Sequence, residues 1–332
     1  MKILVTGGGG FLGEAIVKQL IAKGHEVRVF SRRHFPHLEQ IGVESISGDI
    51  ANFDQVLHAA RDCEVIFHVA AKAGVWGEYD SYYKPNVVGT ENIIQAAKSL
   101  GIKRIVHTSS PSVIFDGKDH EGCDESLSYP ESYIAHYPAT KAIAERLMLE
   151  ANSDRLATVA LRPHLIWGPN DPHLVSRIVE MAKKGRLKFV GSADKKIDTV
   201  WVENAAEAHI LAMENLEIGS KNAGKAYFIT NDEPWGAETW INGILSCVGE
   251  KPVSKRVPFR VAYFTGAIME WIFKTFKLSG EPPLTRFMAT QLGTSHWYSN
   301  QAAFRDFGYK PRISNREGLK LLRKHFEKSH AN

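Results

Sequence analysis

The chain begins with an apolar segment, a glycine-rich turn and an amphipathic segment, in that order. Residues 2–6 (KILVT) are almost wholly apolar, as in a strand covered on both faces. The turn TGGGGFLG places Gly7, Gly10 and Gly13 at intervals of three. Apolar side chains then recur at helical spacing as far as residue 21. This order predicts a buried strand, a tight turn and a helix.

Glycines at this spacing let the main chain approach a phosphate closely. The turn must be tight, the ligand must reach the backbone, and the helix must pack close to the strand. The free N–H groups and the positive dipole end of the helix then favour an anion. Between a strand and a helix, the G-x-x-G-x-x-G spacing predicts a dinucleotide-binding fold; a flexible glycine loop is the alternative. We expect the pyrophosphate to contact Gly7, Gly10, Phe11, Leu12 and Gly13.

The second predicted strand, residues 26–30 (EVRVF), ends at Ser31, Arg32 and Arg33. In folds of this kind an acidic residue at that place binds the ribose 2′-hydroxyl of NAD. A hydroxyl and two guanidinium groups stand here instead, and they suit the 2′-phosphate of NADP. The sequence therefore predicts NADP(H) as the cofactor, the alternative being a basic loop that faces solvent.

Strand and helix patterns continue to alternate as far as residue 163. The alternation predicts a doubly wound parallel sheet of the Rossmann type, in the α/β class. Strands are predicted at residues 43–50, 64–70, 104–108 and 157–163, and helices at 55–60, 86–97 and 140–151. We expect further cofactor contacts at strand ends, from Asp49, Ile50, Ala70, Ala71, Lys72 and Pro163.

The pattern changes after residue 168, where helices and short strands lose their regular alternation. We predict an NADP-binding domain over residues 1–168, with returns near 196–230, and a smaller, mainly helical substrate lobe over 169–332. Asn204 stands where it would cap a helix that runs to residue 215.

Tyr137 and Lys141 form the second motif, Y-x-x-x-K, and lie on one face of the predicted helix. An ammonium beside a phenol favours the phenolate and lowers the phenol's pKa. Tyr137 would then donate or accept a proton nearer neutral pH. Ser110, or its rival Ser109, ends the strand at 104–108 and would hold the same substrate oxygen. The alternative is an exposed helix pair without function.

Together these motifs resemble the extended short-chain dehydrogenase/reductase superfamily over nearly the whole chain. Within it, LRPHLIWGP (161–169) and GEPPLT (280–285) are similar to the 3β-hydroxysteroid dehydrogenase branch. The runs AKAGVWGEYDSY (71–82) and HWYS (296–299) resemble the bacterial 2-alkyl-3-oxoalkanoate reductases of long-chain olefin biosynthesis.

That resemblance implies an enzyme that uses NADPH to reduce a 2-alkyl-3-keto acid to the 2-alkyl-3-hydroxy acid. It implies Ser110, Tyr137 and Lys141 as the catalytic residues, with Asn86 as a helper for the proton path. It also implies a homodimer formed through the helices near residues 90 and 143.

The implied substrate carries a carboxylate and two alkyl chains. Lys72, His164 and Arg286 are candidates for the cation that meets the carboxylate, and the sequence does not rank them. For the chains, residues 257–278 are rich in aromatic and aliphatic side chains, with basic residues toward the end. This segment is interpreted as an interfacial membrane helix or a pocket wall, the alternative being a core helix pair.

The composition fits an ordinary soluble protein, with 44% hydrophobic and 23% charged residues. The net charge of +4 is diffuse, so no nucleic-acid partner is expected. Three scattered cysteines predict neither a disulfide framework nor a metal site. No uncharged apolar stretch reaches the roughly 18 residues of a membrane span, so we expect a cytoplasmic protein, with peripheral contact at the inner membrane face as one option.

Three rival functions remain open. A 3β-hydroxysteroid or sterol dehydrogenase using NAD is disfavoured by the Arg32-Arg33 pair. A nucleotide-sugar epimerase or dehydratase would need a polar lobe, whereas residues 257–278 are aromatic. A dinucleotide-sensing binding protein without catalysis would not need the intact Tyr137 and Lys141 pair.

Overall fold

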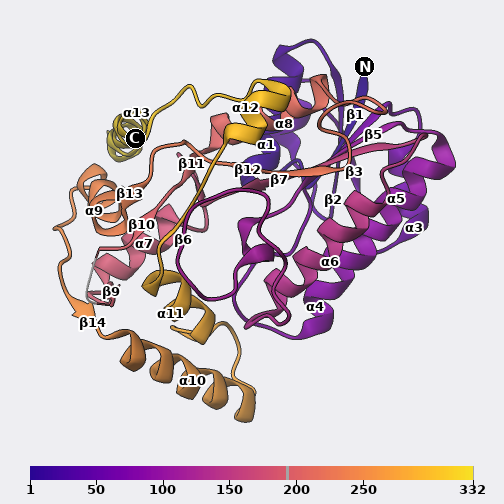
Figure 1. Ribbon diagram of the computed structural model, residues 1–332. Helices are drawn as coiled ribbons and strands as arrows, with labels where there is room; N and C mark the ends of the chain where they lie inside the picture. Colours follow the sequence, from indigo (N-terminus) through magenta and orange to yellow (C-terminus); the bar gives the residue numbers. More distant parts are fainter. Residues whose placement is uncertain (192–193, 332) are drawn as a thin grey trace.

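The structure, a computed structural model that describes residues 1–191 and 194–331, is built on a parallel sheet (Figure 1). Its seven strands lie in the order β12-β7-β5-β4-β1-β2-β3, and every neighbouring pair is parallel. The chain order reverses between β1 and β4, which creates the switch point where ligands of such sheets bind. The strands are β1 (Lys2–Thr6), β2 (Glu26–Ser31), β3 (Glu44–Ser47), β4 (Val65–His68), β5 (Arg104–Thr108), β7 (Ala157–Pro163) and β12 (Lys225–Ile229).

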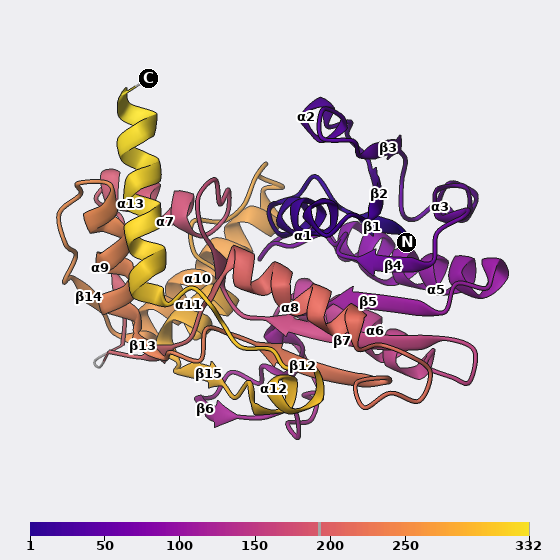
Figure 2. The same ribbon diagram turned by 90° about the horizontal axis from the view of Figure 1, so that it is seen from above.

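Helices cover both faces of this sheet (Figure 2). Because alternate side chains of a strand point to opposite faces, Ile3 and Val5 join one buried apolar cluster and Leu4 joins the other. The doubly wound α/β fold is thereby confirmed. One face carries α1 (Phe11–Ala22) and α8 (Val202–Glu214), and the other carries α3 (Phe53–Ala60), α5 (Gly89–Leu100) and α6 (His136–Glu150).

Helix boundaries differ from the sequence expectation at three places. The predicted helix at 86–97 begins earlier, as α4 (Tyr79–Tyr83), continues through a π-helical turn (Lys84–Val88) and becomes α5. Helix α6 begins four residues before the predicted start. A short helix, α2 (Pro36–Glu39), follows β2 and was not predicted.

The predicted cap at Asn204 is wrong. Helix α8 begins at Val202, so Asn204 lies inside it and is buried. Its amide nitrogen donates to Ile313 O at 2.8 Å and to Asn231 Oδ1 at 2.8 Å. Asn204 therefore attaches the chain's later segment to α8 instead of starting the helix.

The remaining elements form a second group beside the sheet (Figure 1). Three tryptophans mark its core: the ring of Trp167 meets the rings of Trp201 and Trp240 edge to face, with centroids 4.9 and 5.4 Å apart. Strand β12 returns from this part to the large sheet, and the division at residue 168 stays a prediction.

The other elements are a 3-10 turn (Pro111–Ile114), β6 (His120–Cys123), β8 (Ile166–Trp167), α7 (Val175–Lys183), β9 (Phe189–Val190), β10 (Lys196–Ile197), β11 (Val200–Trp201), β13 (Trp235–Gly236), α9 (Ala237–Cys247), β14 (Arg256–Val257), α10 (Phe259–Thr275), α11 (Arg286–Gly293), β15 (His296–Tyr298), α12 (Gln301–Phe307) and α13 (Asn315–Ala331).

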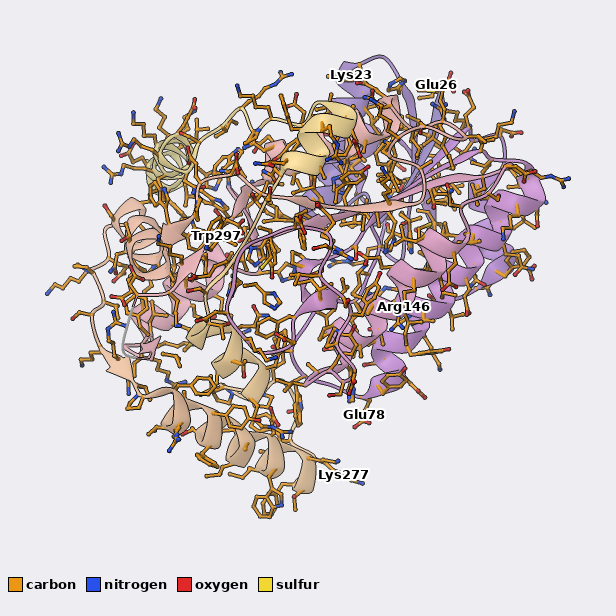
Figure 3. All side chains as sticks on the ribbon, viewed as in Figure 1. Lys23, Glu26, Glu78, Arg146, Lys277 and Trp297 are labelled. Carbon is orange, nitrogen blue, oxygen red and sulfur yellow. The ribbon has the colours of Figure 1, made fainter. Side chains whose placement is uncertain are left out.

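Helix α10 is not a core helix. Its buried residues are Ala262 and Gly266, and a Cβ on Gly266 would lie 2.7 Å from the backbone of Thr285, just before α11. Small residues therefore face α11, while large apolar side chains project outward from the helix (Figure 3). Within the described part of the chain, no helix combines the length and apolarity needed to cross a bilayer.

Candidate active site

The predicted catalytic residues meet where α6 passes the end of β5. Tyr137 lies in the first turn of α6 and is partly exposed, whereas Lys141, one turn later, is buried. The Lys141 ammonium donates to Thr108 O at 2.6 Å and lies 3.5 Å from His107 Nε2. Burial lowers the pKa of Lys141 to about 8, although the charge of Glu145 opposes the shift.

The pKa of Tyr137 differs from the sequence expectation. Burial raises it, and only a hydrogen bond with Ser110 opposes that rise. Lys141 was expected to lower it, but its ammonium is bonded to the β5 carbonyl of Thr108. The phenol therefore stays protonated at neutral pH, which suits a proton donor better than a base.

The two serines after β5 have separate surroundings. Ser110 is partly exposed and lies close enough to the Tyr137 phenol to oppose the rise of its pKa, while its oxygen accepts from the Ser112 hydroxyl at 2.9 Å. Ser109 is buried beside the Glu145 carboxylate. Of the two hydroxyls, that of Ser110 lies beside the Tyr137 phenol and that of Ser109 lies beside Glu145, so the geometry favours Ser110 as the group that binds the substrate oxygen.

Asn86 lies in the π-helical turn, an irregularity that often occurs at functional sites. Its amide oxygen accepts from Lys72 N at 2.7 Å, and its amide nitrogen donates to Lys72 O at 3.1 Å and Thr140 Oγ1 at 3.0 Å. Thr140 is the residue before Lys141 on α6. Asn86 thus ties the loop after β4 to the catalytic helix.

A buried ion pair fixes α6 to the sheet. Arg162 of β7 donates to Glu145 of α6 twice, at 2.9 and 2.6 Å, and Tyr129 donates to the same carboxylate at 2.7 Å. Burial raises the pKa of Glu145, but the Arg162 guanidinium, aided by Ser109 and Tyr129, outweighs it and leaves the carboxylate ionised.

Several of these supporting residues were missed at the sequence level. Glu145 follows Lys141 by four residues on α6 and was within reach of a spacing argument, whereas His107, which lies beside the Lys141 ammonium, belongs to β5 and was not. The role of the Thr108 carbonyl could not be read from side-chain patterns. The His107 imidazole is neutral because burial, and secondarily the Lys141 charge, hold its pKa well below the usual value.

The glycine turn forms a cradle that fits a dinucleotide phosphate. Gly7 has a positive φ of 68°, and a Cβ on Gly13 would lie 2.2 Å from Gly7 O. Helix α1 has no side-chain cap at Gly10, so its first N–H groups remain available for an anion, as the fold requires. Phe11 and Leu12 begin this helix.

The other predicted cofactor residues surround the same edge of the sheet. Arg32 and Arg33 are exposed beyond β2, and the Ser31 hydroxyl donates to Arg33 O at 2.7 Å. The exposed Asp49 accepts from Ala51 N at 3.0 Å. The remaining predicted contacts lie just after β3 or β4 or at the end of β7: Ile50, Ala70, Ala71, Lys72 and Pro163.

The three candidate cations for a substrate carboxylate differ in their partners. His164 Nδ1 lies 2.5 Å from Asp198 Oδ1, and its other ring nitrogen lies 3.1 Å from His296 Nδ1. Arg286 Nε donates to Glu270 at 2.7 Å. Lys72 has no carboxylate within 4 Å among the residues described. In that same part of the chain, no three His, Cys, Asp or Glu side chains are placed to hold a metal ion.

Known proteins resemble this chain over most of its length. Residues 4–254 match the 3-beta hydroxysteroid dehydrogenase/isomerase family. The chain belongs to this family. The 2-alkyl-3-oxoalkanoate reductase of Stenotrophomonas maltophilia is 51% identical, over 97% of this chain and 98% of the relative. That of Shewanella oneidensis is 48% identical, over 96% and 84%. The predicted oxidoreductase is thereby confirmed.

More distant members of the family and solved structures agree. The sterol-4-alpha-carboxylate 3-dehydrogenase (decarboxylating) of Mus musculus is 32% identical, over 96% of this chain and 89% of the relative. The crystal structure of gox2253 superposes with a TM-score of 0.80 at 26% identity, over 99% and 98% of the chains. UDP-glucuronic acid 4-epimerase of Bacillus cereus, in complex with NAD, gives 0.76 at 20% identity, over 99% and 100%. These likenesses support the fold described above.

Proposed function

We propose that this protein reduces a long-chain 2-alkyl-3-oxoalkanoate to the 2-alkyl-3-hydroxyalkanoate with NADPH. The observation that supports this most is that the Ser110 hydroxyl lies close enough to the Tyr137 phenol to affect its pKa, at the edge of the sheet where ligands bind, with Lys141 beneath. The substrate class follows from the relatives at 51% and 48% identity, which are named for it.

The proposed mechanism assigns one task to each residue. Ser110 donates a hydrogen bond to the ketone oxygen and orients it. Tyr137, whose phenol stays protonated because burial raises its pKa, delivers the proton to that oxygen as the alcohol forms. Lys141 would hold the ribose of the dinucleotide, and Asn86 keeps the loop after β4 aligned with α6. The bound dinucleotide would supply the hydride.

The proposal of NADP over NAD rests on the end of β2. Arg32 and Arg33 are exposed, and neither has a carboxylate within 4 Å in the part of the chain that is described. Two unpaired guanidinium groups fit a phosphate, which accepts paired hydrogen bonds from arginine. An acidic residue that would bind the NAD ribose is absent from positions 31–33.

Helix α10 supports a second proposal, contact with the surface of an anionic bilayer. Its outward face has large apolar side chains at helical spacing, among them Phe264 at 64% and Trp271 at 62% exposure. Single exposed apolar residues are ordinary on a protein surface, but a contiguous apolar patch such as this one marks an interaction site. The face also includes Val261 and Ile268, and the exposed Phe276 and Leu278 follow the end of the helix.

The charges beside that face favour lipid over a second protein chain. Arg260, Lys274 and Lys277 are exposed around it, and Lys277 projects at the far end of the helix (Figure 3). The acid on α10, Glu270, is bonded to Arg286. A basic, aromatic, amphipathic helix binds anionic lipid headgroups. The position suits an enzyme whose substrate carries long alkyl chains.

A homodimer through α5 and α6 completes the proposal. The two helices pack side by side on one face of the sheet. The groove between them is open to solvent and is lined by Glu91, Ile94, Gln95, Lys98, Ser99, Leu147, Glu150 and Ala151. The molar mass in solution, measured by light scattering, should be twice that of the chain.

Consumption of NADPH tests the proposed reaction. We expect turnover with a long-chain 2-alkyl-3-keto acid and little with a sterol or a UDP-sugar. Faster turnover of a sterol would favour the hydroxysteroid dehydrogenase function of other family members. Interconversion of a UDP-sugar without net consumption of NADPH would favour an epimerase.

A further inference from the structure

We propose that the side chain of Lys72 binds the substrate carboxylate and thereby selects acids over neutral ketones. The assignment rests on the reductase activity proposed above and adds to it the residue that recognises the acid group. Lys72 lies in the loop after β4, beside the switch point of the sheet, where ligands of this fold bind.

The backbone of Lys72 is held in place by a single side chain. Asn86 accepts from its N–H and donates to its carbonyl, at 2.7 and 3.1 Å, and the same amide reaches Thr140 on α6. Asn86 is buried, so these bonds do not compete with water. The root of the Lys72 side chain is therefore fixed relative to Tyr137 and Lys141 before any substrate arrives.

The Lys72 ammonium has unused bonding capacity. It donates to Ser81 Oγ at 2.7 Å and lies over the ring of Tyr82, 4.6 Å from the centroid. An ammonium has three donors, and these contacts satisfy one of them. The side chain is half-buried, and no carboxylate of residues 1–191 or 194–331 lies within 4 Å of it. A partly buried cation in this state is stabilised by an incoming anion.

The other candidate cations already have partners. Asp198 holds His164, and Glu270 holds Arg286. Arg177 on α7 lies 3.8 Å from Glu281. Lys141 is directed to the Thr108 carbonyl. Lys72 is thus the cation of this group that a substrate carboxylate meets without displacing an acid.

The chemistry of the substrate requires an anion site close to the reacting oxygen. In a 3-oxo acid a single carbon separates the carboxylate from the ketone carbon. Tyr82, which lies under the Lys72 ammonium, belongs to α4, and α4 packs against the start of α6, where the ring centroids of Tyr79 and His136 are 5.4 Å apart. The name of the sterol-4-carboxylate 3-dehydrogenases also places a carboxylate on the carbon next to the reacting one.

The experiment compares an acid with its methyl ester. Because 3-oxo acids lose carbon dioxide readily, the reverse reaction is measured: oxidation of a 2-alkyl-3-hydroxyalkanoate and of its methyl ester with NADP⁺. The quantity is the ratio of kcat/KM for the acid to that for the ester. In Lys72→Met we expect this ratio to fall about 10- to 100-fold, the effect of one charge-assisted hydrogen bond, with ester oxidation retained. Lys72→Arg should restore part of the ratio.

Two variants serve as comparisons. Lys84→Met removes an exposed lysine from the neighbouring π-helical turn and should leave the ratio unchanged. Arg177→Met removes the rival cation on α7 and should do the same. A fall of the ratio in Arg177→Met, without one in Lys72→Met, would transfer the role to Arg177.

Other results overturn the inference in distinct ways. Equal wild-type rates for acid and ester would mean that no cation selects the carboxylate. An unchanged ratio in Lys72→Met together with a raised KM for NADP⁺ would place Lys72 at the cofactor. If the wild-type protein oxidises neither compound, the proposed function fails and the Lys72 assignment fails with it.

Discussion

The Lys141 ammonium donates a hydrogen bond of 2.6 Å to the carbonyl oxygen of Thr108 at the end of β5. The amine is thereby attached to the strand that Ser110 follows, and the Ser110 hydroxyl lies close enough to the Tyr137 phenol to affect its pKa. Burial shifts the two titratable groups in opposite directions, because it raises the pKa of Tyr137 and lowers that of Lys141.

The first prediction concerns the pH dependence of the reaction. Burial lowers the pKa of Lys141 to about 8, so its ammonium is present below pH 8 and is lost as the pH rises above it. We expect kcat/KM for reduction, which reports the free enzyme, to fall above about pH 8. In Lys141→Arg the residual activity should lose this limb, because arginine stays charged. A limb that persists in the arginine variant would assign it to another group.

Loss of the buried ion pair should destabilise the fold. Arg162→Met leaves the buried Glu145 carboxylate without its cation, and we expect a loss of about 3–5 kcal/mol in the free energy of unfolding. The comparison variant is Lys184→Met, which breaks a pair with Glu180 that is exposed on both sides and should change the free energy of unfolding little. Urea unfolding measures both. Equal small losses would mean that the Glu145 pair does not hold α6 to the sheet.

Cofactor preference should depend on the end of β2. In the double variant Arg32→Ala and Arg33→Ala we expect KM for NADPH to rise about tenfold or more, because each substitution removes a charge-assisted hydrogen bond to the 2′-phosphate. KM for NADH should change little, because NADH has no 2′-phosphate. Arg155→Ala, which removes an exposed arginine elsewhere, is the control. Similar rises for both cofactors would refute the NADP assignment.

Helix α10 should determine binding to lipid. The wild-type protein should sediment with vesicles that contain anionic lipid and less with neutral ones. The double variant Phe264→Ser and Trp271→Ser removes two exposed rings from the outward face and should sediment several-fold less. Retained activity on a short-chain substrate would show that the variant is folded. Wild-type protein that stays in the supernatant would contradict binding to lipid. A double variant that sediments like the wild type but has a lower molar mass would assign the outward face to contact with a second chain.

The sequence was most informative where a pattern is local. The strand, glycine turn and helix at residues 2–22 needed no distant contact, and the same holds for the Tyr137 and Lys141 spacing. Where partners are distant, sequence reasoning failed. Asn204 looked like a helix cap, but its partner carbonyl belongs to Ile313, far along the chain.

Two outcomes depended on packing that composition does not specify. The Lys141 amine is bonded to the β5 carbonyl beneath it, and burial, not this amine, sets the direction of the Tyr137 pKa shift, so the predicted lowering of that pKa is wrong. The apolar segment 257–278 was compatible with a core, a pocket or a surface. The exposure of this segment follows from Ala262 and Gly266. Because these two residues are small, α10 packs closely against α11 on their side, and the large apolar side chains face outward.

The most direct measurement of the account is the turnover and cofactor binding of Tyr137→Phe. The substitution removes the phenol oxygen beside Ser110 and keeps the ring. Reduction of the 2-alkyl-3-keto acid should fall about 10²- to 10⁴-fold, the usual contribution of a general acid, while NADPH binding, followed by fluorescence, stays unchanged. Wild-type turnover in this variant, with the cofactor still bound, would contradict the proposal that Tyr137 delivers the proton.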